Sequence, residues 1–167
     1  MRTTFINQNS EGNIREAGKQ SLINCAEDFE YFMNFCGCED IDDLRECLRD
    51  GNFTFSEMRQ AIKTFENVGS FYDYGLCFDF VEVDTFPDLD SGYYRYQLSW
   101  GGPGVEIRFY PDGLIEFVYL DWFCGIGFDV SDEDWAQWLL DFFTDVGSID
   151  FNSIEPEQLY NYENLEY

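Results

Sequence analysis

Residues 93–122 read YYRYQLSWGGPGVEIRFYPDGLIEFVYLDW, and this stretch decides the fold. Apolar and polar side chains alternate over residues 93–100, and apolar runs follow over 105–110 and 114–122. Alternation with a period of two is typical of strands that bury one face. Pro111-Asp112-Gly113 separates the last two runs and is a strong signal for a tight turn. The stretch therefore predicts three consecutive antiparallel strands.

A fourth strand is expected just before this stretch. Residues 75–86 also alternate and are rich in Phe and Val, and a loop over 86–92 connects them to residue 93. The glycine-rich residues 101–104 precede a strand rather than a helix, so they are a hairpin connection and not a phosphate-binding loop. The four strands would form an antiparallel meander.

The residues before the sheet have the spacing of amphipathic helices. Apolar side chains recur every three or four residues over Glu16–Phe35 and again over about Asp40–Arg49. Thr54-Phe-Ser-Glu57 matches a capping box and predicts a third helix, which ends at Gly69.

The residues after the sheet predict two acidic helices. The stretch Ser131–Asp134 resembles a helix start, with acids near the positive end of the helix dipole. This helix should run to about Val146. Pro156 opens a last short helix that ends between Tyr160 and Asn164. The side chains expected to face inward from the first of these helices are Trp135, Trp138, Leu139 and Phe142.

This order of helices, strands and helices predicts an α+β fold with helices on one face of the antiparallel sheet. The length of 167 residues suits a single domain. Within residues 1–167 we expect a loose N-terminal segment, a helical part, the sheet and the acidic helices, at residues 1–13, 14–69, 75–123 and 131–165.

The charge balance excludes several classes of function. The chain has 34 Asp and Glu, 9 Lys and Arg and no His, which gives a formal net charge of −25. Without His there is no Ser-His-Asp triad and no His-ligated metal. Direct binding to nucleic acid or to an anionic membrane is also excluded, because both need basic side chains. Hydrophobic residues make up 45%, so the charge does not indicate disorder.

The negative charge is concentrated toward the C-terminus. No basic residue follows Arg108, and residues 109–167 hold 14 acids. These acids are interleaved with aromatic and aliphatic side chains and do not form an unbroken run. The pattern indicates a folded surface that carries spaced negative charges.

The six cysteines are expected to be reduced. The N-terminus has no apolar stretch typical of a signal peptide, and no segment is apolar enough to span a membrane, so we expect a cytoplasmic protein. Cys36 and Cys38 are the only closely spaced pair, and a zinc site there would need Cys25 or Cys47. The C-x-C spacing is not typical of zinc sites. We expect no metal and no cofactor.

Part of the sequence resembles a group of known proteins. The stretch Gln97-Leu-Ser-Trp-Gly-Gly-Pro103, followed by Arg108-Phe109 and by Leu120-Asp-Trp-Phe123 with Gly125, is similar to small acidic accessory proteins of conjugative plasmids and integrative elements. Their genes often lie beside antirestriction genes. The resemblance covers about residues 75–125, and the relatives are more polar after Gly-Gly-Pro. It implies a mobile genetic element and evasion of host defence, and it brings no catalytic motif.

The amount of charge favours mimicry of DNA. A compact chain of this length has a diameter of about 40 Å, and duplex DNA of that length carries about 24 negative charges. We therefore expect a non-enzymatic inhibitor whose carboxylates replace phosphates in the basic groove of a host defence nuclease, either a restriction enzyme or a CRISPR effector. A symmetric homodimer would double this surface.

Two acidic surfaces are predicted to bind this partner. Tyr160, Tyr162 and Tyr167 would add aromatic contacts, because Tyr is enriched at interfaces. The simpler interpretation of any single charge run is a solvated surface. The main surface comprises the C-terminal acids Asp129, Asp132, Glu133, Asp134, Asp141, Asp145, Asp150, Glu155, Glu157, Glu163 and Glu166. The second comprises Glu39, Asp40, Asp42, Asp43 and Glu46.

Other interpretations stay open. An interaction module for another basic protein, such as a histone-like protein or a replication factor, would use the same surfaces. Asp88-x-Asp90-x-Gly92 partly matches a calcium loop but lacks its glycine and glutamate positions. A carboxylate-dependent glycosidase would need only Asp and Glu, with aromatics such as Trp100, Trp122 and Tyr96 against the sugar. At strand and helix spacing, tryptophans more often lie in the core.

Overall fold

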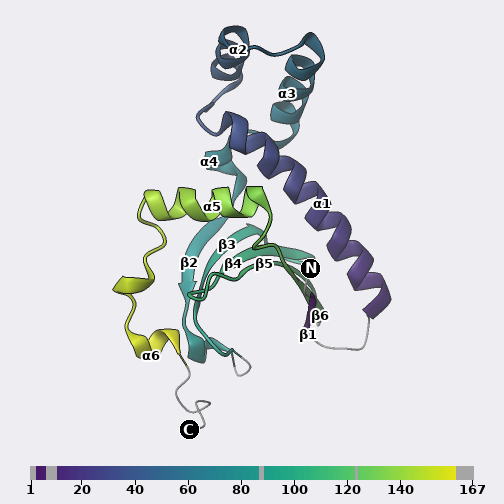
Figure 1. The fold of residues 1–167 in the computed structure, drawn as a ribbon. Helices are drawn as coiled ribbons and strands as arrows, with labels where there is room; N and C mark the ends of the chain where they lie inside the picture. Colours follow the sequence, from purple (N-terminus) through teal and green to yellow (C-terminus); the bar gives the residue numbers. More distant parts are fainter. Residues whose placement is uncertain (1–2, 7–10, 87–88, 123, 161–167) are drawn as a thin grey trace. The chain divides into compact units, whose positions relative to one another are not determined.

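The computed structural model describes residues 3–6, 11–86, 89–122 and 124–160 (Figure 1). The fold is α+β, as the sequence predicts. Contacts divide the chain into two compact units, which we call the sheet unit (residues 1–18 and 76–167) and the helical unit (residues 19–75). The single domain expected over the whole chain stays a prediction.

The sheet unit contains six antiparallel strands in the order β1-β6-β5-β4-β3-β2. The four predicted strands correspond to β2–β5, which form the expected meander. The first of them is shorter than the predicted residues 75–86, because a 3-10 turn, η2 (Val83–Thr85), follows it. The strands are β1 (Thr3–Ile6), β2 (Cys77–Val81), β3 (Tyr93–Ser99), β4 (Gly104–Phe109), β5 (Ile115–Asp121) and β6 (Cys124–Asp129).

The prediction of four strands is wrong at the far edge of the sheet, where two more strands follow β5. β6 contains Gly125 and Gly127, which have low strand propensity, and it is ordered by pairing with β5 along its whole length. β1 lies in the segment expected to be loose and pairs with β6 from Thr3↔Phe128 to Ile6↔Gly125. Pairing with residues more than 100 positions away makes this segment a strand.

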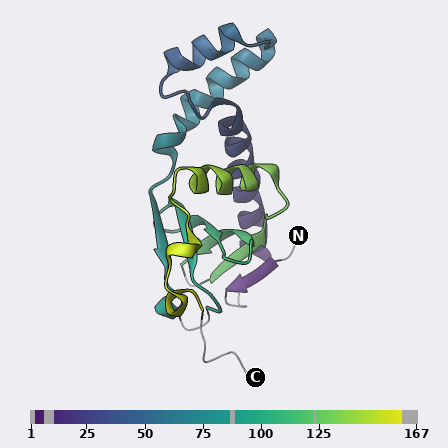
Figure 2. The same cartoon turned by 60° about the vertical axis from the view of Figure 1, so that its left-hand side comes forward.

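One face of the sheet carries the core of the sheet unit, and helix α5 (Asp134–Asp145) packs across it (Figure 2). The ring of Phe143 lies 4.3 Å from that of Phe78 and 5.0 Å from that of Tyr96, measured between centroids. The first turns of α1 (Glu11–Phe35) contact the same face at β6, where a Cβ on Gly18 would lie 2.7 Å from Ile126. Helices therefore cover one face, as predicted.

The C-terminal helices are shorter than predicted. α5 begins at Asp134 because Ser131 is used elsewhere: its hydroxyl donates to Asp129 and accepts the main-chain N–H of Ile115. A 3-10 turn, η3 (Phe151–Ser153), leads to α6 (Pro156–Leu159). The predicted extension of α6 beyond Tyr160 lies outside the described residues.

The tryptophans divide between core and surface. Trp135 is buried and Trp138 is half-buried, in agreement with the prediction. Trp100 and Trp122 are 78% and 84% exposed, so the expectation of a core position is wrong for both. Each follows the last residue of its strand, where the alternation of the strand no longer sets the direction of the side chain.

The helical unit contains the rest of α1, α2 (Ile41–Asp50), α3 (Phe55–Val68) and the short α4 (Phe71–Tyr74). α2 and α3 match the predicted helices, and Thr54 with Glu57 forms the predicted capping box. α1 ends at Phe35 as predicted but begins at Glu11, so its first residues lie in the segment that was wrongly expected to be loose. Edge-to-face contacts among Phe29, Phe32, Phe71 and Tyr74 build an aromatic core. Within the described residues, no helix has the length and apolar character needed to cross a bilayer.

The carboxylate of Asp28 gives a pH-dependent prediction for this unit. Burial raises the pKa of Asp28, although the Tyr74 hydroxyl donates to its Oδ2 at 2.7 Å and opposes this rise. A raised folded pKa contributes stability that is complete below the unfolded pKa, near 4, and is lost as pH rises through the folded value. Asp28→Asn keeps an acceptor for Tyr74 and carries no charge at any pH.

We therefore expect the free energy of unfolding of Asp28→Asn, relative to that of the wild type, to increase as pH rises from about 3 to 7. The gain should stay below about 1 kcal/mol, because the group is only partly shielded from water. Urea unfolding at both pH values measures it. Tyr74→Phe is the control and should lose stability at pH 7, because the ionised carboxylate then lacks its donor. A constant difference between Asp28→Asn and wild type across this range would contradict the prediction.

Candidate functional site

The C-terminal acidic surface, as we use the term, is a set of exposed acids on the sheet unit between residues 132 and 157. Each side chain is exposed to solvent, and neither Lys nor Arg occurs anywhere in residues 109–167. The surface follows the start of α5, its outer side and the turns that lead to α6. Its eight members are Asp132, Glu133, Asp134, Asp141, Asp145, Asp150, Glu155 and Glu157.

The outer side of α5 carries acids where they are least favourable for the helix. Asp141 and Asp145 are four residues apart and exposed, while Trp135, Leu139 and Phe143 are buried on the other side. Like charges at this spacing repel. Both also lie in the half of the helix that carries the negative end of its dipole, and no basic residue lies in the last turn. Helix stability therefore does not account for these two carboxylates.

Not every predicted acid is available at this surface. Asp129 is half-buried, and its carboxylate accepts hydrogen bonds from the main-chain N–H and the hydroxyl of Ser131. Asp150 is exposed, but one oxygen caps η3 through the N–H of Asn152. Tyr160 is exposed. The remaining predicted residues, Glu163, Glu166, Tyr162 and Tyr167, lie outside the described residues.

The second predicted surface lies in the helical unit, at the start of α2. All five acids, Glu39 to Glu46, are exposed, but three have local roles. Asp40 caps α2 by accepting from the N–H groups of residues 42 and 43, and Asp43 accepts from the N–H of Glu39. Asp42 pairs with Arg45 at 2.9 Å. Capping and the nearby arginines make this surface a weaker candidate than the C-terminal one.

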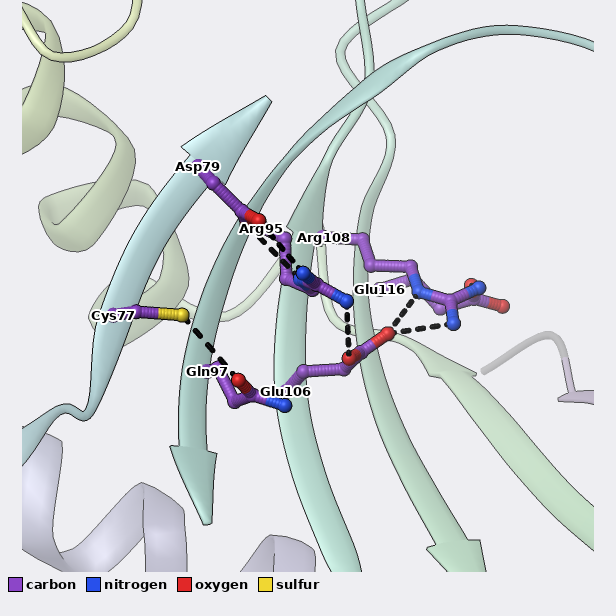
Figure 3. Close-up of polar contacts among 7 residues, drawn as sticks. All are labelled: Cys77, Asp79, Arg95, Gln97, Glu106, Arg108 and Glu116. Carbon is purple, nitrogen blue, oxygen red and sulfur yellow. Dashed lines mark hydrogen bonds and ion pairs between the residues drawn. The ribbon is translucent and has the colours of Figure 1, made fainter. Parts of the chain in front are cut away.

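A row of charged side chains, which no local sequence pattern predicts, crosses the other face of the sheet (Figure 3). The strand register places Asp79, Arg95, Arg108 and Glu116 side by side on β2, β3, β4 and β5. Glu106 lies two residues before Arg108 and therefore on the same face. We call these five residues the charged row.

Short contacts join the members of the charged row. Arg95 donates to both oxygens of Asp79 at 2.9 and 2.6 Å, and its Nη1 lies 3.9 Å from Glu106. Arg108 donates to Glu106 Oε1 from Nε at 2.7 Å and Nη2 at 2.6 Å. Its Nη1 lies 4.0 Å from Glu116, which also accepts from the Tyr110 hydroxyl at 3.4 Å.

The charged row is buried at its centre. Glu106 is 3% exposed, and the guanidinium of Arg108 lies 4.8 Å above the ring of the fully buried Tyr93. Burial disfavours the charged guanidinium, but Glu106, together with Tyr93 and Tyr110, outweighs this cost, and the pKa of Arg108 is raised. For the neighbouring tyrosine hydroxyls, burial raises the pKa of Tyr93 and of Tyr110. Three carboxylates thus pair with two arginines on this face of the sheet, with the pair of Arg108 and Glu106 buried and the pair of Arg95 and Asp79 partly exposed.

This arrangement is suited to stability rather than to acid–base catalysis. The two buried carboxylates already accept hydrogen bonds, Glu106 from Arg108 and Glu116 from Tyr110, so their oxygens are engaged within the sheet. The alternation within each strand was visible in the sequence, but the row depends on the register between strands. Finding the row from the sequence would have required a prediction of the strand pairing that places these charged positions opposite one another.

The glycine beneath Glu116 is required by the charged row. A Cβ at Gly127 would lie 2.6 Å from the carboxyl carbon of Glu116 and would push this side chain away from Arg108 and Tyr110. We expect Gly127→Ala to lower the free energy of unfolding by about 1–3 kcal/mol, measured by urea denaturation. Gly37→Ala is the control and should change it by less than about 0.5 kcal/mol, because a Cβ there meets nothing within 4 Å. Equal stability of Gly127→Ala and wild type would show that Glu116 does not lie over β6.

Metal binding finds no further support. Among the described residues, no three Cys, Asp or Glu side chains are grouped so that they could hold a metal ion. In the calcium-like stretch, Asp90 is exposed, and Asp88 lies outside the described residues.

The fold and the two charge arrangements define an acidic α+β protein whose arginines in the sheet are internally paired. No family model matches the chain, and neither the curated proteins nor the solved structures contain a match to it.

Proposed function

We propose that this chain is a non-enzymatic inhibitor that acts in the bacterial cytoplasm and is encoded by a mobile genetic element of the kind its central segment resembles. The C-terminal acidic surface occupies the basic nucleic-acid groove of a host defence nuclease, either a restriction enzyme or a CRISPR effector. The observation that carries the proposal is a set of eight exposed carboxylates, spaced over a segment that contains no basic residue.

The charge of the sheet unit is close to that of DNA of the same size. Its 110 residues hold 22 acids and 4 bases, a net charge of −18, while the helical unit holds 12 acids and 5 bases, a net charge of −7. A compact unit of that length is about 34 Å across. Duplex DNA of 34 Å carries about 20 charges. The sheet unit alone therefore approaches the charge density of a duplex.

The position of individual charges supports the same function. Arg95 and Arg108 are paired inside the charged row, so they do not neutralise the outer surface. Asp141 and Asp145 stand where they weaken α5. Residues that break a local stability rule are common at functional sites. The destabilisation of α5 by Asp141 and Asp145 is explained if these exposed carboxylates bind a basic partner.

Inhibition follows from competition for one groove. Lys and Arg side chains that normally contact phosphates donate to the carboxylates, and counterions are released from both surfaces. Association is fast at low salt and weakens steeply as salt increases. The surface needs no catalytic group, because a groove filled by protein cannot bind DNA or RNA.

Affinity capture from a bacterial lysate tests the proposal. The tagged whole chain is the bait, and bound proteins are eluted with a salt gradient or with duplex DNA. We expect one nuclease or CRISPR effector to elute sharply at a few hundred millimolar salt and to be displaced by DNA. Elution of many basic proteins together at low salt would overturn the proposal. It would indicate that the acids form only a solvated surface.

Capture of a single basic protein with no nuclease activity would favour the alternative interaction module. In that case DNA would compete only if the partner itself binds DNA.

A further inference from the structure

Two cysteine sulfur atoms in the helical unit lie next to each other. The Cys38 thiol donates to the sulfur of Cys47 across 3.5 Å. Cys38 lies in the connection between α1 and α2, and Cys47 lies in α2. All six cysteines belong to the described residues, and all are free thiols. Among them, this is the one pair whose sulfur atoms are within hydrogen-bonding distance.

The backbone holds both cysteines in place. The N–H of Cys38 donates to the carbonyl of Phe35 at 3.0 Å, and the carbonyl of Cys47 accepts from the N–H of Gly51 at 3.0 Å. Only a small approach of the two sulfur atoms is needed to reach the bonding distance of about 2.05 Å. The reduced pair is therefore already arranged for bond formation.

The two thiols differ in access to solvent. Cys47 is exposed, whereas Cys38 is 2% exposed. Burial, and after it the hydrogen bond with Cys47, raises the pKa of Cys38 to about 12, which keeps this thiol protonated and unreactive toward external reagents. An oxidant from solution can reach Cys47, and Cys38 can then react only from inside. This is the usual division between an attacking and a resolving cysteine.

We propose that Cys38 and Cys47 form a reversible disulfide by thiol–disulfide exchange with a small disulfide such as oxidised glutathione. The Cys47 thiolate attacks the glutathione disulfide, a bond to one glutathione forms, and the other leaves as a thiolate. The sulfur of Cys38 then attacks Cys47, the internal disulfide forms, and the second glutathione leaves. The protons of the two cysteines end on the two glutathione thiols, so two thiols are oxidised and one disulfide is reduced.

The disulfide would close a ring around the second acidic surface. All five of its acids, residues 39 to 46, lie between the two cysteines. The bond would fix the segment in which Asp40 caps α2, and it would restrict the unfolded chain. Oxidation is thus expected to stabilise the helical unit around these charges. This inference does not depend on the proposed partner.

Equilibration of the whole chain in glutathione buffers tests the site. The ratio of oxidised to reduced glutathione is increased stepwise, the reaction is stopped with acid, and free thiols are labelled with N-ethylmaleimide in denaturant. We expect two fewer maleimide adducts than the six of the reduced chain, and a peptide that links Cys38 to Cys47. The oxidised form should unfold a few degrees higher, and dithiothreitol should reverse both effects.

Matched variants separate this pair from the other cysteines. Cys47→Ser should abolish the linked peptide and the thermal shift, and because Cys47 is exposed the change leaves the core intact. Cys77→Ser, also at an exposed position, should change neither readout. A stable glutathione adduct on Cys47, or a linked peptide that contains Cys36, would overturn the assignment.

Discussion

Arg108→Met is expected to lower the free energy of unfolding by about 3–5 kcal/mol. The substitution keeps much of the side-chain volume but removes the cation that Glu106 and Glu116 share. Glu106 is buried and keeps only the longer contact to Arg95, at 3.9 Å. An ionised carboxylate without a partner in the interior carries its full desolvation cost. Urea denaturation monitored by tryptophan fluorescence at neutral pH measures the loss.

Arg45→Met is the matched control for this prediction. It breaks the exposed pair between Arg45 and Asp42 on α2, and we expect a loss of no more than about 1 kcal/mol. In the triple variant Arg108→Met/Glu106→Leu/Glu116→Leu the unpaired charges are removed, and stability should largely return. A loss below about 1 kcal/mol for Arg108→Met alone would mean that water solvates the charged row.

Asp141→Lys combined with Asp145→Lys is expected to weaken binding to the captured partner about 100-fold, or ~2.7 kcal/mol. Two attractive contacts in a basic groove become repulsive, and like charges at an interface cost several kcal/mol. The fold should not suffer, because Lys near the C-terminal end of α5 interacts favourably with the helix dipole. Titration at fixed salt measures the affinity, and thermal unfolding should show equal or slightly higher stability.

Glu27→Lys combined with Glu30→Lys is the matched control on α1. These exposed acids make the same change in net charge but belong to neither predicted surface. We expect less than a 3-fold effect on affinity. Equal losses from both variants would show that total charge matters and that the C-terminal acidic surface does not contact the partner. Asp132→Lys/Glu133→Lys/Asp134→Lys tests the other end of α5, but it also places positive charge at the positive end of the helix dipole.

Much of the fold was accessible from local pattern. The alternation in residues 93–122 predicted β3, β4 and β5 together with their turns, and the capping box at Thr54 and Glu57 predicted the start of α3. β1 and β6 were not accessible in this way. Two glycines weaken the strand pattern of β6, and β1 is ordered by pairing with β6. Both depend on a partner strand rather than on their own propensity.

The candidate site, too, has some features that the sequence predicts and others that depend on contacts between distant residues. The number of acids and their concentration after Arg108 could be read from the sequence, and eight of the predicted C-terminal acids are exposed. Asp129 could not be recognised as an exception, because its bonds to Ser131 arise where β6 turns toward α5. The arginines of the charged row could not be recognised as paired, because their partners come from other strands.

The sequence by itself determined the helix and strand periods, the total charge and its uneven distribution, because these properties depend on composition and on residues close together in the chain. Only the tertiary structure decided which charges face water and which are paired inside the sheet. Arg95 and Arg108 are two of the four basic residues in the sheet unit. Strand register places both against carboxylates of neighbouring strands, and burial shields the pair of Arg108 and Glu106 from water.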